Sequence, residues 1–363
     1  MKIVNHVGTS TLTEKNGLLN KRYIKEFAKA VAGLQNDGNK VLIVSSGAIG
    51  AGQGHLELKE SPKTLREKQA LAAVGQPIIM AYYYAYFAKY GKKNVAQLLL
   101  TRDDFDNRAK YINARNTLNE LTERGIIPII NENDTVAVEE INFGDNDTLA
   151  ALVAAAVDAD KLIIFTDVDG LYDGHPSKSN LIPRVEKITE KIESFATGNS
   201  ASGKGTGGMK TKLTAAKIAS ISGTDTIIAN GERLSSLKEI IEGNGTCTVF
   251  DAGKRFLEAK KTWIAFSKKP KGNIFVDKKA CEVLTKKGKS LLAAGIVKIN
   301  GDFKRGDTVT VSDFETKKDF ARGLVNYGSP DLHKIKGKKT SEMKKIIEAA
   351  EDEIIHRDNL VIL

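Results

Sequence analysis

The sequence predicts an α/β protein: a three-layer sandwich with a mainly parallel sheet between helices, followed by a small β-rich domain. Short apolar runs recur about 30 to 60 residues apart, with amphipathic stretches between them. Strands that are apolar throughout and joined by helices are typical of parallel sheets buried on both faces. Each run ends in polar or glycine-containing sequence, and ligands bind at the carboxyl ends of strands in such sheets. The apolar runs are Ile3–Val7, Val41–Val44, Val95–Leu100, Ile126–Ile130, Leu162–Phe165 and Thr226–Ala229.

The segments between these runs suit helices. Between residues 20 and 34, apolar residues recur at the spacing of one helix face. They are Ile24, Phe27, Ala28, Val31 and Leu34. An aromatic cluster follows Pro77 and is more typical of a core or a subunit interface than of a ligand site. Its members are Tyr82, Tyr83, Tyr84, Tyr86 and Phe87.

Composition limits the class of protein. The chain has 363 residues, which suits two domains, and its 41% hydrophobic and 28% charged residues are ordinary for a globular protein. The longest apolar run, Leu149–Val157, is far too short to cross a bilayer. No charged-then-apolar leader precedes the first run, and Cys247 and Cys281 match no metal or disulfide spacing. We therefore expect a cytoplasmic protein that does not enter a membrane.

The charge is distributed unevenly. Residues 1–253 contain 30 Lys and Arg against 30 Asp and Glu, whereas residues 254–363 contain 25 against 15 and so carry the whole net charge of +10. We predict a first domain over residues 1–253, a lysine-rich linker over 254–271 with a strand at Trp263–Phe266, and a β-rich domain over 272–363. The basic part indicates either a second module with a different partner or simple solubility charge. The expected strands of the second domain are Asn273–Val276, Gly295–Ile299, Asp307–Val311 and Leu360–Leu363.

Small-residue segments follow the first two apolar runs. The segment Gly8–Ser10 (GTS) lets backbone N–H groups approach a phosphate closely. Ser45–Gly52 (SSGAIGAG), which includes Ser46 and Gly47, lies between a strand and a predicted helix, where the first helical N–H groups are unpaired. We expect this second segment to hold a carboxylate or a phosphate. A tight turn without a ligand is the alternative for both.

Two denser polar clusters lie within 17 residues of each other, at Asn131–Asp134 and Gly144–Asp147. Asp134 suits an ammonium group, and Asn146 suits a carboxylate through its amide. Helix capping is the alternative, because Asp147 immediately precedes an apolar helical run. Two such clusters so close together are poor material for a core, so we favour ligand binding.

Two later segments indicate nucleotide binding. Thr166–Tyr172 (TDVDGLY) follows another apolar run, and its carboxylates could orient a metal-bound nucleotide or its ribose. Ser202–Lys212 (SGKGTGGMKTK) is glycine-rich and ends in a lysine, which suits a polyphosphate. A mobile loop would have a similar composition.

In this order and spacing, SSGAIGAG, INENDTV, FGDND, TDVDGLY and GTGGMKTK closely resemble the motifs of the glutamate 5-kinases of the amino-acid kinase family. The resemblance covers nearly the whole chain, and residues 272–363 resemble the PUA domain that many of these enzymes carry. It implies an amino-acid-kinase-like fold and ATP-dependent phosphorylation of the L-glutamate side-chain carboxylate, the first step of proline biosynthesis. It also implies a homo-oligomer, a dimer or a tetramer, that proline inhibits.

The resemblance further implies roles for individual residues. Glutamate is bound by Ser46, Gly47, Asp134 and Asn146. Asp147 lies beside the substrate in the catalytic set, and Lys212 contacts the transferred phosphate. The residues assigned to ATP are Gly8, Thr166, Asp167, Thr206, Gly207, Gly208, Met209, Lys210, Thr211 and Lys212. No metal-binding residue is assigned.

One residue departs from the family pattern. The family has a lysine two residues before the glycine of GTS, in a pattern like VKVGTS, and this chain has His6 there. We place His6 in the catalytic set as the counterpart of that cation, although histidine is shorter and only partly charged near neutral pH. A weakened enzyme, compensation by a neighbouring cation and an inactive relative are the three interpretations. A His6→Lys change raises kcat if the position acts as it does in the family.

The expected reaction is attack of the glutamate side-chain carboxylate on the γ-phosphate of Mg-ATP, giving γ-glutamyl phosphate and ADP. The carboxylate is already ionised at neutral pH, so no general base is needed. Catalysis then rests on positioning and on neutralising negative charge with Mg²⁺, Lys212 and backbone N–H groups.

Two alternatives stay open. An RNA-binding or regulatory protein with a weakened kinase domain fits the basic second domain and His6. That domain has few clustered aromatic residues, however, and its lysines are scattered among acids; RNA affinity would depend steeply on salt. A kinase for another acidic amino acid is the second alternative. ADP release measured with glutamate, aspartate and N-acetylglutamate would distinguish it from a glutamate kinase.

Overall fold

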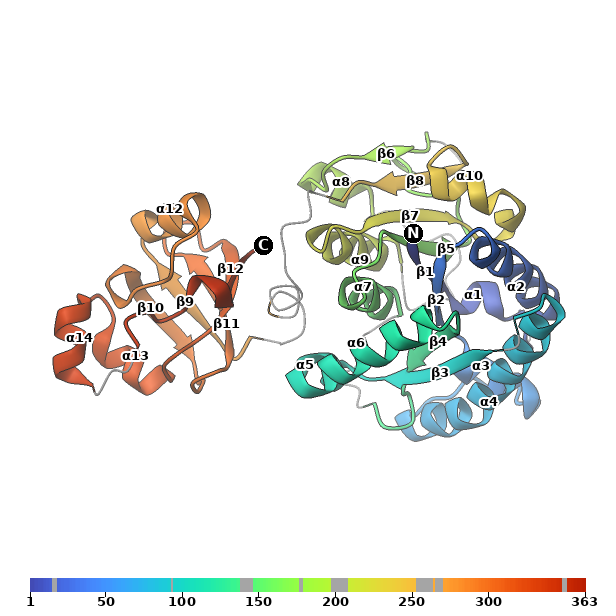
Figure 1. The fold of residues 1–363 in the computed structure, drawn as a ribbon, viewed down its shortest axis with the longest axis horizontal. Coiled ribbons are helices and arrows are strands. Elements are labelled where there is room, and N and C mark those ends of the chain that lie inside the picture. Colours follow the sequence, from blue (N-terminus) through green and yellow to red (C-terminus); the bar gives the residue numbers. More distant parts are fainter. Residues whose placement is uncertain are drawn as a thin grey trace. The chain divides into compact units, whose positions relative to one another are not determined.

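The computed structural model describes residues 1–14, 18–92, 94–137, 146–175, 179–196, 208–252, 264, 270–347 and 351–363. The chain divides into two compact units, Met1–Phe256 and Leu257–Leu363. Each unit has a sheet and a hydrophobic core of its own (Figure 1). The division falls inside the predicted linker, most of which lies outside the described residues. Of the strand expected at Trp263–Phe266 only Ile264 is described, and it is helical instead of extended, so the prediction is wrong at that residue.

The sheet of the first unit has the strand order β3-β4-β2-β1-β5-β7-β8-β6. Neighbouring strands from β3 to β7 are parallel, β8 is antiparallel to β7, and β6 is parallel to β8. The predicted α/β class with a mainly parallel sheet is therefore confirmed. The strands are β1 (Lys2–Val7), β2 (Lys40–Ser45), β3 (Val95–Leu100), β4 (Ile127–Glu132), β5 (Lys161–Thr166), β6 (Arg184–Val185), β7 (Asp225–Asn230) and β8 (Cys247–Phe250).

Helices cover both faces of this sheet and complete the three layers (Figure 1). Helices α2 and α4 lie on one face, and α6, α7 and α9 lie on the other. Among the described residues, no helix is both long enough and apolar enough to cross a membrane. The helices are α1 (Thr9–Leu12), α2 (Lys21–Asn36), α3 (Ala48–His55), α4 (Leu65–Lys89), α5 (Arg102–Asp106), α6 (Arg108–Glu123), α7 (Asn146–Ala156), α8 (Glu190–Phe195), α9 (Met209–Ile221), α10 (Leu237–Glu242) and the 3₁₀ helix η1 (Gly231–Ser236).

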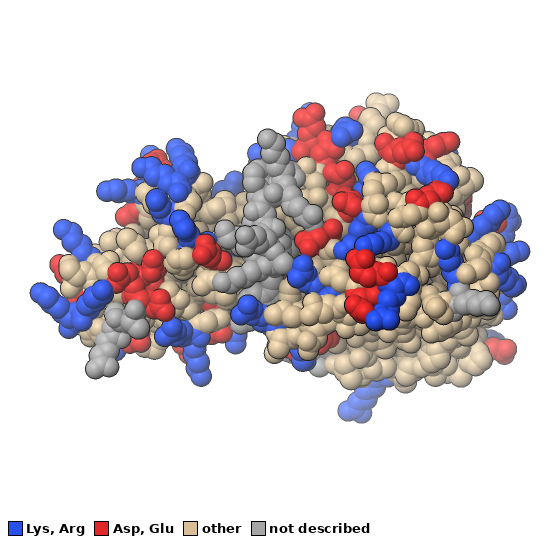
Figure 2. Space-filling view, in the orientation of Figure 1, with Lys and Arg blue, Asp and Glu red and all other residues tan. Residues whose placement is uncertain are grey.

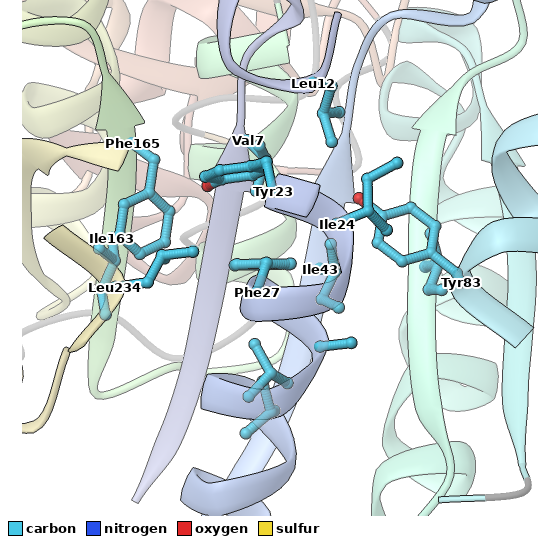
Figure 3. Packing of buried hydrophobic residues seen from close by; sticks show 14 of the residues in the cluster. Val7, Leu12, Tyr23, Ile24, Phe27, Ile43, Tyr83, Ile163, Phe165 and Leu234 are labelled. Carbon is cyan, nitrogen blue, oxygen red and sulfur yellow. The ribbon is translucent and has the colours of Figure 1, made fainter. Parts of the chain in front are cut away.

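The core between α2 and the sheet shows why these sequences form these elements (Figure 3). The side chain of Asn20 caps α2 by accepting the backbone N–H of Tyr23 at 3.0 Å. The apolar face of α2 then packs on alternate residues of the strands, with Phe27 edge-on to Phe165 at a centroid distance of 5.8 Å. The predicted helix and all six predicted strands of this unit are confirmed.

The aromatic cluster on α4 is divided between the core and the surface. Tyr83 and Phe87 are fully buried, whereas Tyr84 is 48% exposed. The Tyr83 hydroxyl lies 3.1 Å from Ser45 Oγ, where Ser45 is both the last residue of β2 and the first of the small-residue segment. Tyr83 thus supports the strand end as well as the core.

The second unit is the predicted β-rich domain. Its five-stranded sheet has the order β10-β9-β11-β12-β13, in which only the β9–β11 pair is parallel. Lysines concentrate on α12 at positions 278, 279, 286 and 287, where Figure 2 shows a dense group of basic side chains. The elements are β9 (Gly272–Val276), α12 (Lys278–Lys287), η2 (Ala293–Gly295), β10 (Ile296–Gly301), β11 (Thr308–Asp313), β12 (Asp319–Leu324), α13 (Ser329–Ile335), α14 (Thr340–Ile346), η3 (Arg357–Asn359) and β13 (Leu360–Ile362).

Candidate active site

Three described helices of the first unit begin with a glycine instead of a capping side chain. Gly8, Gly47 and Gly208 are the N-cap residues of α1, α3 and α9, and none of these helices has a side-chain cap. Gly47 has a φ of +89°, which favours glycine at that position. By contrast, Asn20 and Thr64 cap α2 and α4 with their side chains. The first backbone N–H groups of α1, α3 and α9 are therefore available to anions.

Asn146, at the start of α7, reaches the end of β2. Its Nδ2 lies 2.9 Å from the Ser45 carbonyl oxygen, 2.8 Å from Ser46 Oγ and 2.8 Å from Asn131 Oδ1. The carbonyl of Ser45 only accepts hydrogen bonds, so the atom facing it is the amide nitrogen. Asn146 Oδ1 is buried and has no hydrogen-bond partner among the described residues. This free acceptor suits a hydrogen-bond donor, and the expectation that the amide holds a carboxylate stays a prediction.

Asp147 is the next residue of α7, and its carboxylate turns to the other side. It is 2% exposed, and its oxygens lie 3.0 Å from Lys212 Nζ, 2.8 Å from Thr211 Oγ1 and 3.2 Å from His6 Nε2. Burial opposes ionisation of Asp147, but the hydrogen bonds and charges of His6, Lys212 and Thr211 outweigh it and hold its pKa well below its usual range. Asp147 is therefore an anion whose oxygens contact residues of β1 and α9, and it is not simply a helix cap.

His6 lies on β1, is 4% exposed and belongs to the same cluster through its contact with Asp147. Its Nδ1 lies 3.1 Å from the carbonyl oxygen of Val44, its register partner on β2. Its other ring nitrogen faces Asp147. The four side chains of His6, Asp147, Thr211 and Lys212, here called the charge cluster, connect β1, α7 and α9.

Two consecutive residues therefore link two different environments. Asn146 faces the strand end at Ser46, and Asp147 faces Lys212 in the first turn of α9. A buried cation beside uncapped helix starts stabilises phosphate, and amide and hydroxyl groups hold a small polar ligand. The N-terminus of α7 can thus hold an acceptor molecule directly beside a phosphoryl group.

Comparison with known proteins agrees with this geometry. Residues 1–230 match the amino acid kinase family, and residues 272–347 match the PUA domain. Over the full chain, 49% of residues are identical to the glutamate 5-kinase of Thermoanaerobacter sp. strain X514, and 50% to that of Caldanaerobacter subterraneus subsp. tengcongensis, with 98% of each relative covered. The chain belongs to the glutamate 5-kinase family.

One solved structure shares this fold. The UMP kinase of Ureaplasma parvum matches with a TM-score of 0.50 at 12% identity, over 69% of this chain and 98% of that chain. At this identity the match shows the fold alone.

The residues predicted to bind nucleotide are placed in part. Thr166, at the end of β5, is buried and donates a hydrogen bond to Asp167 at 3.0 Å, and Asp167 is exposed. Gly208 to Lys212 form the start and first turn of α9, with Lys210 exposed. Thr206 and Gly207, like Gly144 and Asp145 of the FGDND motif, lie outside the described residues.

Gln76, which supports Asn131 of the predicted polar cluster, was not predicted from the sequence of this glutamate 5-kinase family member. Asn131 Nδ2 donates to Gln76 Oε1 at 2.9 Å, and both side chains are buried. Gln76 lies inside the apolar stretch of α4. A lone buried glutamine in such a helix was the available signal, because buried polar groups need partners.

Proposed function

We propose that this protein transfers the γ-phosphoryl group of ATP to the side-chain carboxylate of L-glutamate, which is the first step of proline biosynthesis. The observation that carries this proposal is the divergence of Asn146 and Asp147 into a small-ligand side and a cationic side. Full-length identity near 50% to glutamate 5-kinases names the acceptor.

The reaction needs no removal of a proton from the nucleophile. A glutamate carboxylate, with a pKa of about 4.3, is ionised at neutral pH. Its oxygen forms a bond to the γ-phosphorus while the bond from that phosphorus to the β,γ-bridging oxygen breaks, and ADP leaves. Lys212 and the uncapped starts of α1, α3 and α9 neutralise the phosphoryl oxygens, while Asp147 holds Lys212 in place.

We assign Mg²⁺ to the phosphates of ATP. Mg²⁺ commonly keeps phosphate and water ligands with few protein carboxylates. Within the described ranges, no three His, Cys, Asp or Glu side chains gather as a metal site. When bound, the ion would supply charge neutralisation to the phosphates of ATP.

Glutamate-dependent ADP release tests the proposed function. Purified protein is incubated with Mg-ATP and with glutamate, aspartate or N-acetylglutamate, and ADP formation is followed together with trapping of the acyl phosphate by hydroxylamine. We expect turnover with glutamate and less than about a hundredth of it with the other two. ADP release that is independent of the amino acid, or greatest with aspartate, would contradict the assignment of the acceptor.

Asp134 gives the affinity for glutamate a pH dependence. Burial raises the pKa of Asp134 to about 6, so this carboxyl is neutral below that pH and charged above it. If Asp134 holds the ammonium group of glutamate, KM for glutamate rises as pH falls below about 6, approaching tenfold per unit, while the ammonium group and both carboxylates of glutamate stay ionised down to about pH 5. An Asp134→Asn variant should show a high KM that no longer changes between pH 5 and 8. A wild-type KM that is constant over this range would remove Asp134 from the substrate site.

We also propose that the protein is a homo-oligomer, a dimer or a tetramer. Helix α4 has no charged residue between Gln69 and Ala88, yet its outer face is exposed at Ala73, Pro77 and Tyr84. A charge-free exposed face of this length suits a contact between copies. Light scattering that gives only the 39.4 kDa mass of one chain at micromolar concentration would refute this assembly.

Inhibition by proline is proposed on the basis of the family resemblance. Proline carries a carboxylate and an ammonium group on one carbon, as glutamate does, so it can compete for the same small-ligand side. Rates measured at fixed glutamate with increasing proline test this directly, and unchanged rates at millimolar proline would count against it.

A further inference from the structure

Both ring nitrogens of His6 lie close to acceptor oxygens, Nδ1 in a hydrogen bond and Nε2 in an ion-pair contact. Nδ1 lies 3.1 Å from the Val44 carbonyl oxygen, and Nε2 lies 3.2 Å from Asp147 Oδ1. The side chain is almost fully buried, so water does not replace either partner. A histidine at this position is therefore held at both ends of its ring.

The two acceptors beside the His6 ring limit its protonation state. A neutral imidazole carries one N–H, and its other nitrogen is an acceptor. If only Nδ1 carried the proton, the lone pair of Nε2 would face the carboxylate of Asp147. If only Nε2 carried it, the lone pair of Nδ1 would face the carbonyl of Val44. Each neutral form places two acceptors in contact within a buried site, which is costly, and only the imidazolium gives each acceptor a donor.

We propose that His6 is a positioning residue in the form of an imidazolium, which holds Asp147 for Lys212 and Thr211 and does not itself contact the transferred phosphate. Both of its N–H groups are already used, so none is left for a phosphate oxygen. This role differs from that of the lysine at the same position in the resembling family, whose ammonium has three donors. The catalytic part of this inference rests on the proposed function, whereas the protonation state does not.

The charge balance of the cluster gives the imidazolium its effect. With His6 protonated, two cations share the single negative charge of Asp147, and one net positive charge remains for the phosphoryl group. With His6 neutral, Lys212 and Asp147 cancel each other, and Lys212 is held as an ordinary buried ion pair. Loss of the second proton from His6 should therefore weaken the site for phosphate without moving the substrate side at Asn146.

The surroundings of His6 offer no other partner of this kind among the described residues. On α7, the neighbour of His6 is Asp147. On α9, Lys212 and Thr211 contact Oδ2 of Asp147, whereas His6 contacts Oδ1. From β2 it meets the Val44 carbonyl, and its register partner on β5 is the apolar Ile164.

The protonation state is tested on the full-length protein by ¹⁵N NMR of the histidine rings at pH 7. The chain has five histidines, so a His6→Gln sample assigns the His6 signals by their absence. We expect both His6 nitrogens to show the shifts of protonated imidazolium. A neutral spectrum, with one nitrogen lacking its proton, would overturn the proposal.

Kinetics over pH 6 to 9 test its effect on catalysis. His6→Gln can still reach Asp147 with an N–H but carries no charge, and we expect its kcat to be about 10²-fold below wild type with KM for glutamate nearly unchanged. His6→Lys restores a permanent cation, so it should recover most of the activity at pH 7. His6→Gln that matches wild type, or His6→Lys that exceeds wild type by tenfold or more at every pH, would refute the positioning role.

His55 provides the matched control for the His6→Gln variant. It is exposed at the end of α3 and should tolerate replacement by glutamine without change in kcat or pH profile.

The outcomes distinguish this inference from the proposed function. If wild type shows no glutamate-dependent turnover, the proposed function fails, while the NMR measurement still decides the protonation of His6. An imidazolium spectrum combined with a His6→Gln variant as active as wild type would refute the role while leaving the function intact.

Discussion

Replacement of Lys212 by methionine is expected to lower kcat for glutamate phosphorylation by about 10²–10³-fold, the usual cost of removing one preorganised charge contact to the transition state. Lys212 is 8% exposed and is held 3.0 Å from Asp147, so its ammonium is already oriented when ATP arrives. Methionine fills a similar volume without the charge. KM for glutamate should change little, because the small-ligand side is held by Asn146 and Ser46.

The design of this experiment separates chemistry from folding. Asp147 keeps His6 and Thr211 as partners in the Lys212→Met variant, which limits the cost of leaving a buried carboxylate. Thermal unfolding of each variant should confirm that the protein is folded. The matched control is Lys217→Met on the same helix, where an exposed lysine pairs with Glu193, and its kcat should stay within about twofold of wild type.

Coupling within the charge cluster adds a second measure. Asp147→Asn removes the anion that separates His6 from Lys212, so it should lower kcat as well. Because these groups act together, the double variant Asp147→Asn/Lys212→Met should lose much less than the product of the two single losses. If the kcat losses of the two single variants multiplied fully in the double variant, the charge cluster would not be the phosphoryl site. A Lys212→Met variant with kcat within threefold of wild type would contradict it as well.

The main strands of the first sheet could be predicted from the sequence for a physical reason. Strands buried on both faces must be apolar throughout, so β1, β2, β4, β5 and β7 stand out between amphipathic segments. The two-residue β6 and the four-residue β8 at the edge were missed, because such short segments carry no pattern. In the second unit β12 was missed because it contains charged residues and a glycine.

The candidate site was predicted as a set of segments but not as a geometry. Motifs at strand ends identified Ser46, Asn146, Asp147 and Lys212, since polar residues after a buried strand have few structural uses. No pattern could show that adjacent residues 146 and 147 face opposite sides, or that both nitrogens of His6 are occupied. Those facts depend on the register of β1 with β2 and on the start of α7 above them, which are tertiary properties.

The segment SSGAIGAG also has a second use that its composition concealed. Its small residues were interpreted as an anion loop, which fits Gly47 at the start of α3. Gly52, however, faces Leu71 of α4, and a Cβ there would lie 2.0 Å from the Leu71 carbonyl oxygen. The same segment therefore both begins the anion site and lets two helices touch through their backbones.

This close contact leads to the largest expected effect on stability. A Cβ on Gly75 of α4 would lie 1.9 Å from the Ala48 carbonyl oxygen and 2.5 Å from the Gly52 nitrogen. These are backbone atoms of α3, so no side-chain rotation can relieve the clash, and α3 must move away from α4. We expect Gly75→Ala to cost about 3 kcal/mol or more, at the upper end of overpacking. In thermal unfolding this corresponds to a Tm lower by roughly 6–12 °C for a unit of this size.

The matched control is Gly33→Ala on α2, where a Cβ would meet nothing within 4 Å. The same substitution there should stabilise the protein by about 0.4–1 kcal/mol, because alanine loses less backbone entropy in a helix. The variants also differ in what they do to the site. A displaced α3 carries Gly47 and Ser46 away from Asn146, now 2.8 Å from Ser46 Oγ, so Gly75→Ala should raise KM for glutamate at temperatures where it is still folded. If Gly75→Ala kept both the Tm and the KM of wild type, the α3–α4 contact would not be what positions the anion site.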